Sequence, residues 1–143
     1  MTYEATRNRV ETYFDRTATK TWERLTSDAP VSGIRATVRA GRDRMRDVIL
    51  RQLPHDLTGA RILDAGCGTG ALAFELAARG ADVMGVDISP QLIDIARRRT
   101  PHDLHQSLTF RAGDMLDESL GSFDHIIAMD SMIYYTAPDI ARI

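Results

Sequence analysis

Apolar side chains recur at helical spacing through the first third of the chain. They stand three or four residues apart in two stretches, which predicts amphipathic helices over residues 4–25 and 34–53. Residues 27–33 lie between these stretches and contain proline, glycine and serine, as expected of a loop. The first third should therefore form two N-terminal helices that each have one apolar face.

The rest of the chain alternates short apolar runs with helical patterns. The runs predict four buried strands, at residues 61–65, 81–87, 108–112 and 124–129. Gly80 should close the helix after the first strand, and Ser89 with Pro90 should begin the next one, which Thr100 and Pro101 end. Alternating strands and helices imply right-handed crossovers and a parallel sheet, here in the order 3-2-1-4. The predicted fold class is α/β and Rossmann-like.

A glycine-rich turn follows the first predicted strand. Asp64 stands near the end of the strand, and Gly66, Gly68 and Gly70 follow at alternate positions. Glycine adopts backbone torsions closed to residues with a Cβ, so a ligand can lie against bare main chain at the start of the next helix. Asp64 could accept hydrogen bonds from an ammonium group of that ligand. A turn that only packs a helix against a strand would also use glycine, so this motif alone leaves both interpretations open.

The other predicted strands also end in acidic residues. Asp87 follows the second strand, Asp114 the third and Asp130 the fourth. A carboxylate after the second strand is the group that accepts both ribose hydroxyls in doubly wound nucleotide-binding folds. A nicotinamide-binding domain is the rival interpretation, but its G-x-G-x-x-G fingerprint lacks the leading Asp. The glycine spacing with Asp64 therefore favours a different nucleotide ligand.

These motifs resemble the class I S-adenosylmethionine-dependent methyltransferases. The resemblance implies that Asp64 and the glycine turn hold the methionyl part of S-adenosylmethionine and that Asp87 holds its ribose. Asp114 would bind the adenine amino group, with Met115 against the ring. The resemblance also places Ile88, Asp130 and Arg42 in the cofactor site. Arg42 would reach toward the methionyl carboxylate.

Four further segments are similar to the magnesium-protoporphyrin O-methyltransferase family of chlorophyll and bacteriochlorophyll biosynthesis: Tyr13–Leu25, Val38–Arg42, Ile88–Ile93 and Met129–Tyr135. This resemblance implies methyl transfer to a propionate of magnesium-protoporphyrin IX, which gives the monomethyl ester. Because a propionic acid is already ionised near neutrality, no general base is needed. Tyr13 and Tyr134 are the implied catalytic residues, and they would act by positioning. Plant and cyanobacterial relatives have His in place of Tyr134, so Tyr134 would act through its hydroxyl.

The resemblance also implies strands beyond the fourth, which this chain lacks. We therefore expect an N-terminal portion of a longer protein, about 80 to 100 residues short, with an open edge at the fourth strand. Residues 1–53 would form a helical region on the substrate side, and residues 54–143 the incomplete cofactor-binding region. Such a chain should show no methyl transfer alone. The alternatives are a class I methyltransferase acting on a quinone or small molecule, and a cofactor-binding fragment without catalysis.

Charge is unevenly distributed over a chain whose net charge is −2. Residues 1–53 hold eleven basic against seven acidic side chains, and residues 54–143 hold seven against thirteen. Solvated helix faces explain this pattern, and so would contacts with porphyrin carboxylates or an anionic membrane. The expected partners are the porphyrin substrate and the porphyrin-binding subunit of magnesium chelatase. No nucleic-acid partner is predicted.

Cysteine and histidine positions constrain the remaining functions. Cys67 is the single cysteine, so no internal disulfide can form and a reducing compartment is expected. No two of the four histidines have the i, i+4 spacing of a helical metal site with a further carboxylate, so no metal is predicted. No apolar run approaches the roughly 20 residues that cross a bilayer. We expect a cytoplasmic protein that can associate peripherally with the photosynthetic membrane.

Overall fold

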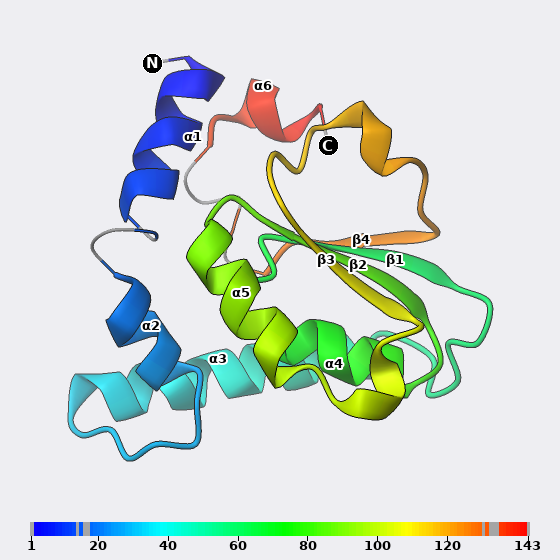
Figure 1. Cartoon of the computed structure of the whole chain (residues 1–143), viewed down its shortest axis with the longest axis horizontal. Helices are drawn as coiled ribbons and strands as arrows, with labels where there is room; N and C mark the ends of the chain where they lie inside the picture. The colour runs from blue at the N-terminus through cyan, green and yellow to red at the C-terminus, as the bar shows by residue number, and fades with distance from the viewer. Residues whose placement is uncertain (1, 14, 16–17, 130, 132–134, 143) are drawn as a thin grey trace.

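The computed structural model describes residues 2–13, 15, 18–129, 131 and 135–142 of the chain. Figure 1 shows the helices around one sheet. The helices are α1 (Tyr3–Thr12), α2 (Thr19–Leu25), α3 (Ile34–Arg51), α4 (Ala71–Ala78), α5 (Pro90–Arg99) and α6 (Ala137–Ile140), with short 3-10 helices η2 (His102–Leu104) and η3 (Glu118–Leu120). The strands are β1 (Arg61–Ala65), β2 (Asp82–Asp87), β3 (Leu108–Ala112) and β4 (His125–Ile127).

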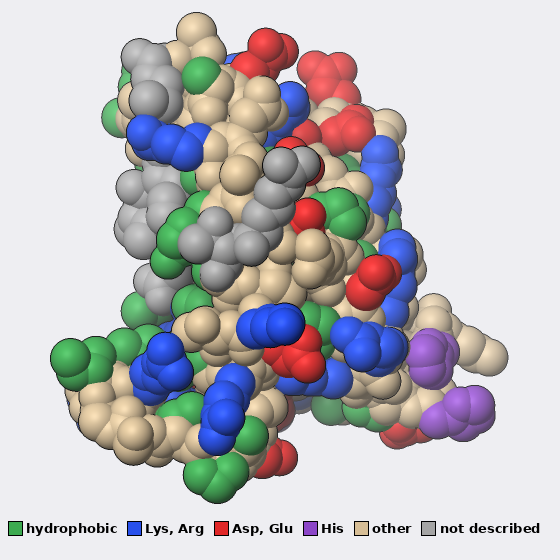
Figure 2. Space-filling view, turned by 60° about the vertical axis from the view of Figure 1, so that its left-hand side comes forward, with side chains coloured by type: hydrophobic (Ala, Val, Ile, Leu, Met, Phe, Trp, Pro, Cys, Tyr) green, Lys and Arg blue, Asp and Glu red, His purple; other side chains and the backbone are tan. Residues whose placement is uncertain are grey.

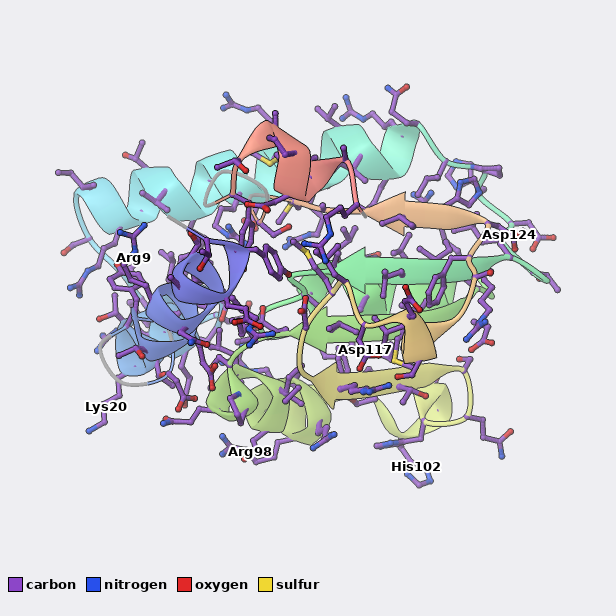
Figure 3. All side chains as sticks on the ribbon, turned by 90° about the horizontal axis from the view of Figure 1, so that it is seen from above. Arg9, Lys20, Arg98, His102, Asp117 and Asp124 are labelled. Carbon is purple, nitrogen blue, oxygen red and sulfur yellow. The ribbon has the colours of Figure 1, made fainter. Side chains whose placement is uncertain are left out.

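The four strands form one parallel sheet in the order β3-β2-β1-β4, which confirms the predicted order. The bounds of β1 and β3 are those predicted, whereas β4 is shorter than the predicted residues 124–129. In the part of the chain that the structure describes, β4 pairs with β1 alone and forms an edge. The strands run away from the end that carries Asp124 and His102, so their carboxyl ends face the N-terminal helices (Figure 3).

Each face of the sheet has its own apolar cluster. The larger cluster joins the strands to α4, α5 and the last turn of α3, and its fully buried members include Ile62, Leu76 and Ile93. The smaller cluster, on the opposite face, packs Leu63 and Val86 against Leu120 of η3. Because the larger cluster fixes α4 and α5 on the strands, the turns between strands and helices are fixed as well.

The ends of α4 and α5 confirm the capping residues predicted from the sequence. Gly80 follows α4 with a φ of 97°, and its N–H donates to the Ala77 carbonyl while the Ala81 N–H donates to the Leu76 carbonyl. These two hydrogen bonds form a Schellman motif. At the start of α5 the Ser89 hydroxyl accepts from the Leu92 N–H at 3.3 Å, and Pro90 occupies the first turn.

The N-terminal region departs from the prediction, because residues 4–25 form two helices and not one. The Ala18 N–H donates to the Tyr13 carbonyl at 2.8 Å, a hydrogen bond that spans five residues. Such a bond interrupts the four-residue ladder of an α-helix. Asp15, between the two helices, directs its side chain to α5. Within the residues that the structure describes, α1, α2 and α3 therefore precede β1 instead of the two predicted helices.

Two arginines hold the C-terminal end of α2. The Arg39 Nε of α3 donates to the Leu25 carbonyl at 2.8 Å. The Arg99 guanidinium of α5 donates to the Glu23 and Thr26 carbonyls at 3.0 and 3.2 Å. The last carbonyls of a helix lack partners within it and carry partial negative charge, so both arginines suit this end. They fix α2 against the sheet region.

Candidate functional site

The glycine turn after β1 exposes bare backbone at the carboxyl end of the sheet. Gly66, Gly68 and Gly70 all have positive φ, at 77°, 56° and 92°. A Cβ on Gly66 would lie 2.4 Å from the Ser131 Cβ, closer than real Cβ atoms approach. Ser131 is itself fixed, because its hydroxyl donates to the Ala65 carbonyl at 2.9 Å. Gly66 therefore needs glycine for both its torsion and its space.

Asp64 lies at the base of this turn with 2% of its surface exposed. Its Oδ2 atom is buried and has no hydrogen-bond partner among the described residues. Burial raises the pKa of Asp64 to about 7, the neighbouring Asp87 adds to the rise, and Arg42 opposes it. A buried acceptor without a partner is costly, and a donor cation would satisfy it. The atom thus fits an ammonium group.

Asp87, at the end of β2, is held by backbone donors. The Gly68 N–H donates to Oδ2 at 2.9 Å, and the Ser89 N–H donates to Oδ1 at 3.0 Å. Burial raises the pKa of Asp87, whereas these N–H groups lower it. Each carboxylate oxygen can accept more than one hydrogen bond, so Asp87 keeps the capacity to accept from two hydroxyl groups.

Asp114, after β3, is held from the other side by α1. The Tyr3 hydroxyl donates to Asp114 Oδ1, and the Arg7 guanidinium donates to Oδ2 at 3.1 Å. The Tyr3 ring also packs on the Tyr135 ring, with centroids 5.1 Å apart. Burial raises the pKa of Tyr135 to about 12, and Asp114 and Asp87 add to this. Residues from both ends of the chain thus meet at one carboxylate.

Two cavities lie side by side at the glycine turn. The first is about 280 Å³ and runs along Asp87 and Asp114 beneath α1. The second is about 250 Å³ and reaches Asp64 between α2 and α3. Four residues line both cavities: Trp22, Arg42, Gly66 and Met129. A ligand with a nucleoside at one end and an amino acid at the other could therefore occupy both cavities at once.

Most of the predicted cofactor residues gather at these cavities. Those that line the first are Arg42, Gly66, Gly68, Asp87, Ile88, Asp114 and Met115, and Asp64 lines the second. Gly70 lines neither, because it faces the Phe110 and Phe74 rings of the core. Tyr13 also lies outside both linings, with 52% of its surface exposed. Asp130 and Tyr134 fall outside the described residues.

Trp22 lines the candidate site, although the sequence pattern did not identify it. Its helical spacing predicts a core position, but the structure leaves it partly exposed and places it in the lining of both cavities. Its Nε1 atom would lie 3.3 Å from a Cβ on Gly68, and the Arg42 guanidinium stacks 4.5 Å from its ring centre. Tyr3 and Arg7 were also missed, since no motif marks them.

The described residues include no group of three or more His, Cys, Asp or Glu side chains that could hold a metal ion. None of the helices in the described ranges has the length and hydropathy to cross a bilayer. On the face that carries α1 and α2, Lys and Arg side chains stand with Asp and Glu side chains among them (Figure 2).

Three comparisons relate the chain to known proteins. The family model described as a methyltransferase domain matches residues 62–143. The chain is 62% identical over 142 residues to magnesium-protoporphyrin O-methyltransferase of Rhodobacter capsulatus, covering 99% of this chain and 63% of that protein. It is 36% identical over 88 residues to ubiquinone biosynthesis O-methyltransferase of Xanthomonas oryzae pv. oryzae, covering 58% of this chain and 36% of that protein.

The fold is similar to a crystal structure of magnesium protoporphyrin IX methyltransferase from Synechocystis PCC 6803 with bound SAH. The TM-score is 0.87 at 29% identity, and the match covers 96% of this chain and 64% of that one. The chain thus spans less than two thirds of the length of each of these three proteins.

Proposed function

The chain belongs to the methyltransferase domain family, and from this premise we propose that it is the cofactor-binding part of a magnesium-protoporphyrin IX O-methyltransferase. The reaction would transfer a methyl group from S-adenosylmethionine to a propionate carboxylate of the porphyrin and give the monomethyl ester. The observation that carries this proposal is the 62% identity to the R. capsulatus enzyme, which extends over 99% of this chain and hence over the N-terminal helices.

The residues at the glycine turn fit S-adenosylmethionine. The unpartnered Asp64 Oδ2 would accept from its ammonium group, and the Gly66 backbone, which lines both cavities, would border its methionyl chain. Asp87 would accept from the ribose hydroxyls, and the first cavity extends from there to Asp114 and Met115 for the adenine. The sequence motif and the cavities thus agree on the same ligand.

Exposed apolar side chains of α3 support a porphyrin as the acceptor. Val38 of α3 lines the first cavity and is 41% exposed, and Ile34, one turn earlier, is 82% exposed. Exposed apolar side chains at the mouth of a cavity favour an apolar ligand. A quinone acceptor would also be apolar, but the similarity to the ubiquinone enzyme covers only 58% of this chain.

Bound S-adenosylmethionine would supply the methyl group on a positively charged sulfur. The chain's own residues hold and enclose the reactants. Asp64 and Asp87 orient the two ends of the cofactor, while Trp22 and Met129, where the cavities meet, exclude water. The propionate needs no base because its pKa is about 4.3. Alignment of the reactants in a site that excludes water then lowers the activation free energy of methyl transfer. The positioning roles of Tyr13 and Tyr134 remain predictions.

The proposal extends to partners and location. A porphyrin-binding subunit of magnesium chelatase would deliver the substrate, and the protein would work in the cytoplasm, at the surface of the photosynthetic membrane. Cosedimentation with vesicles of anionic lipid and affinity capture of the chelatase subunit test these two expectations separately.

The test of the activity is incubation with magnesium-protoporphyrin IX and methyl-labelled S-adenosylmethionine. We expect label in a porphyrin ester when the chain is extended to the length of its relatives, and none above background with residues 1–143 alone. A demethylated quinol precursor, assayed in parallel, should stay unlabelled. Label in the quinol alone would assign the protein to the quinone enzymes, and binding of the cofactor without any product from the extended chain would make it a binding module.

A further inference from the structure

Asp15 joins the N-terminal helices to the first turn of α5. Its Oδ1 atom accepts from the Ser89 hydroxyl at 3.0 Å and from the Gln91 N–H at 3.1 Å. Pro90 has no N–H, so Gln91 and Leu92 are the first donors of α5 that need acceptors. Asp15 satisfies the first of these donors and the Ser89 hydroxyl satisfies the second. The N-cap of α5 is therefore built from two distant parts of the chain.

The same serine supports the ribose carboxylate. Ser89 is fully buried, and its N–H donates to Asp87 Oδ1 at 3.0 Å. Asp87 in turn accepts from the Gly68 N–H through its other oxygen. Hydrogen bonds thus run without a break from Asp15 through Ser89 and Asp87 to the glycine turn. Any shift of Ser89 would be passed to both Asp87 and Gly68.

We propose that Asp15 is a positioning residue for the cofactor, which sets the Asp87 carboxylate and the glycine turn through its hydrogen bonds to the start of α5. This inference rests on the proposed function for the identity of the ligand. The Ser89 hydroxyl donates to Asp15, so its lone pair points to the Leu92 N–H. Without the Asp15 oxygen, the Gln91 N–H loses its partner and the hydroxyl is free to rotate.

Arg99 supplies the matched control. It binds α2 to the other end of α5 through the Glu23 and Thr26 carbonyls and the Thr26 hydroxyl, and none of these hydrogen bonds involves Ser89 or Asp87. Loss of Arg99 should loosen only the end of α2, because Arg39 still binds the Leu25 carbonyl there, and should leave Trp22 and the ribose carboxylate in place. Loss of Asp15 should disturb both α2 and the ribose carboxylate of Asp87. A purely structural role for Asp15 predicts that the two variants behave alike.

The experiment compares Asp15→Ala, Asp15→Asn and Arg99→Ala in the 143-residue chain, first by amide hydrogen exchange without ligand. For Asp15→Ala we expect about tenfold faster exchange at Gln91, Leu92 and Gly68, because one buried hydrogen bond is lost and its neighbours loosen. Asp15→Asn keeps an acceptor oxygen and should exchange within about twofold of the unmodified chain. Arg99→Ala should change exchange in α2 alone. Unchanged exchange at Gly68 in Asp15→Ala would overturn the inference.

Calorimetry with S-adenosylhomocysteine then tests the consequence for binding. We expect Asp15→Ala to raise the dissociation constant about tenfold, and the other two variants to stay within about twofold. Equal weakening in Arg99→Ala, or none in Asp15→Ala, rejects the inference while the proposed function stands. If the unmodified chain does not bind, the proposed cofactor is wrong, and the exchange data still decide the role of Asp15. Should Asp15→Ala not fold, Asp15→Glu provides the same test, because it keeps the charge but displaces the acceptor.

Discussion

The two sides of the proposed cofactor cavity are held by different kinds of contact. On the sheet side, the backbone of the glycine turn makes the hydrogen bonds. The Gly66 N–H donates to the Val86 carbonyl at 2.7 Å, and the Gly68 N–H donates to the Asp87 carboxylate. On the side of the N-terminal helices, long side chains reach across. Tyr3 and Arg7 bind Asp114, and Asp15 binds Ser89.

This difference predicts different responses to change. Backbone contacts in the turn depend on φ and on the space beside each Cα, so a single added methyl group should disrupt them. The side-chain contacts each depend on one or two polar atoms, and the Arg7–Asp114 pair is partly exposed to water. We therefore expect larger effects from changes on the sheet side than from changes on the helical side.

The largest effect should follow from Gly66→Ala. The new Cβ meets Ser131 at 2.4 Å on a backbone with a φ of 77°, and forced positive φ alone costs roughly 1–3 kcal/mol. We expect cofactor affinity to fall at least about 100-fold in calorimetry and the melting temperature to fall by about 10 °C. Gly41→Ala in α3 is the control, since nothing lies within 4 Å of its Cβ. It should stabilise the helix by about 0.5–1 kcal/mol. Equal binding by both variants would contradict the assignment of the turn.

Asp87→Ala should rank second. It removes the acceptor for the Gly68 and Ser89 N–H groups together with the proposed partner of the ribose. Charge-assisted hydrogen bonds contribute roughly 1.5–3 kcal/mol each, so we expect S-adenosylmethionine affinity to fall by one to two orders of magnitude, about 10- to 100-fold. Asp82→Ala, exposed at the other end of β2, should bind as the unmodified chain does. An unchanged affinity in folded Asp87→Ala protein would refute the ribose assignment.

Asp64→Asn should have two effects of opposite sign. The folded pKa of about 7 lies above the ordinary 3.8, so the folded state binds the proton more tightly, and the burial of Asp64 costs stability that is fully felt above pH 7. The variant should therefore melt about 5 °C higher at pH 8 and no differently at pH 4. Its cofactor affinity should be about tenfold lower.

The pH dependence of binding sharpens the Asp64 prediction. An ammonium ligand needs the ionised carboxylate, so affinity of the unmodified chain should fall up to about tenfold for each pH unit below 7. Calorimetry on Asp64→Asn should show no such slope, whereas exposed Asp103→Asn should keep it. A lower melting temperature for Asp64→Asn at pH 8 would show that Asp64 is a structural residue.

The sheet side could be predicted from the sequence because its determinants are local. A glycine turn after Asp64, and strands ended by Asp87 and Asp114, are read from spacing alone, and the parallel order follows from the alternation of strands and helices. The capping residues Gly80 and Ser89 were predictable for the same reason.

The helical side could not be predicted in this way. Between α1 and α2, Asp15 binds Ser89, which lies 74 positions later in the sequence. Tyr3 binds Asp114, and 111 positions separate these two residues. Periodicity records only which face of a helix is apolar, so Trp22 looked like a core residue. Its exposure to both cavities follows from the tertiary position of α2, which Arg39 and Arg99 fix.

The smallest effect should follow from Tyr3→Phe, which removes only the hydroxyl that donates to Asp114. Arg7 and the Leu116 N–H still donate to that carboxylate, and the ring still packs on Tyr135. We expect amide exchange in α1 to quicken about tenfold, while the melting temperature falls by less than about 2 °C because few apolar contacts are lost. Asn8→Ala, on the exposed face of α1, should leave exchange unchanged or slow it. A fall in melting temperature as large as that of Gly66→Ala would mean that α1 is as integral to the fold as the glycine turn, and the contrast between the two sides would be wrong.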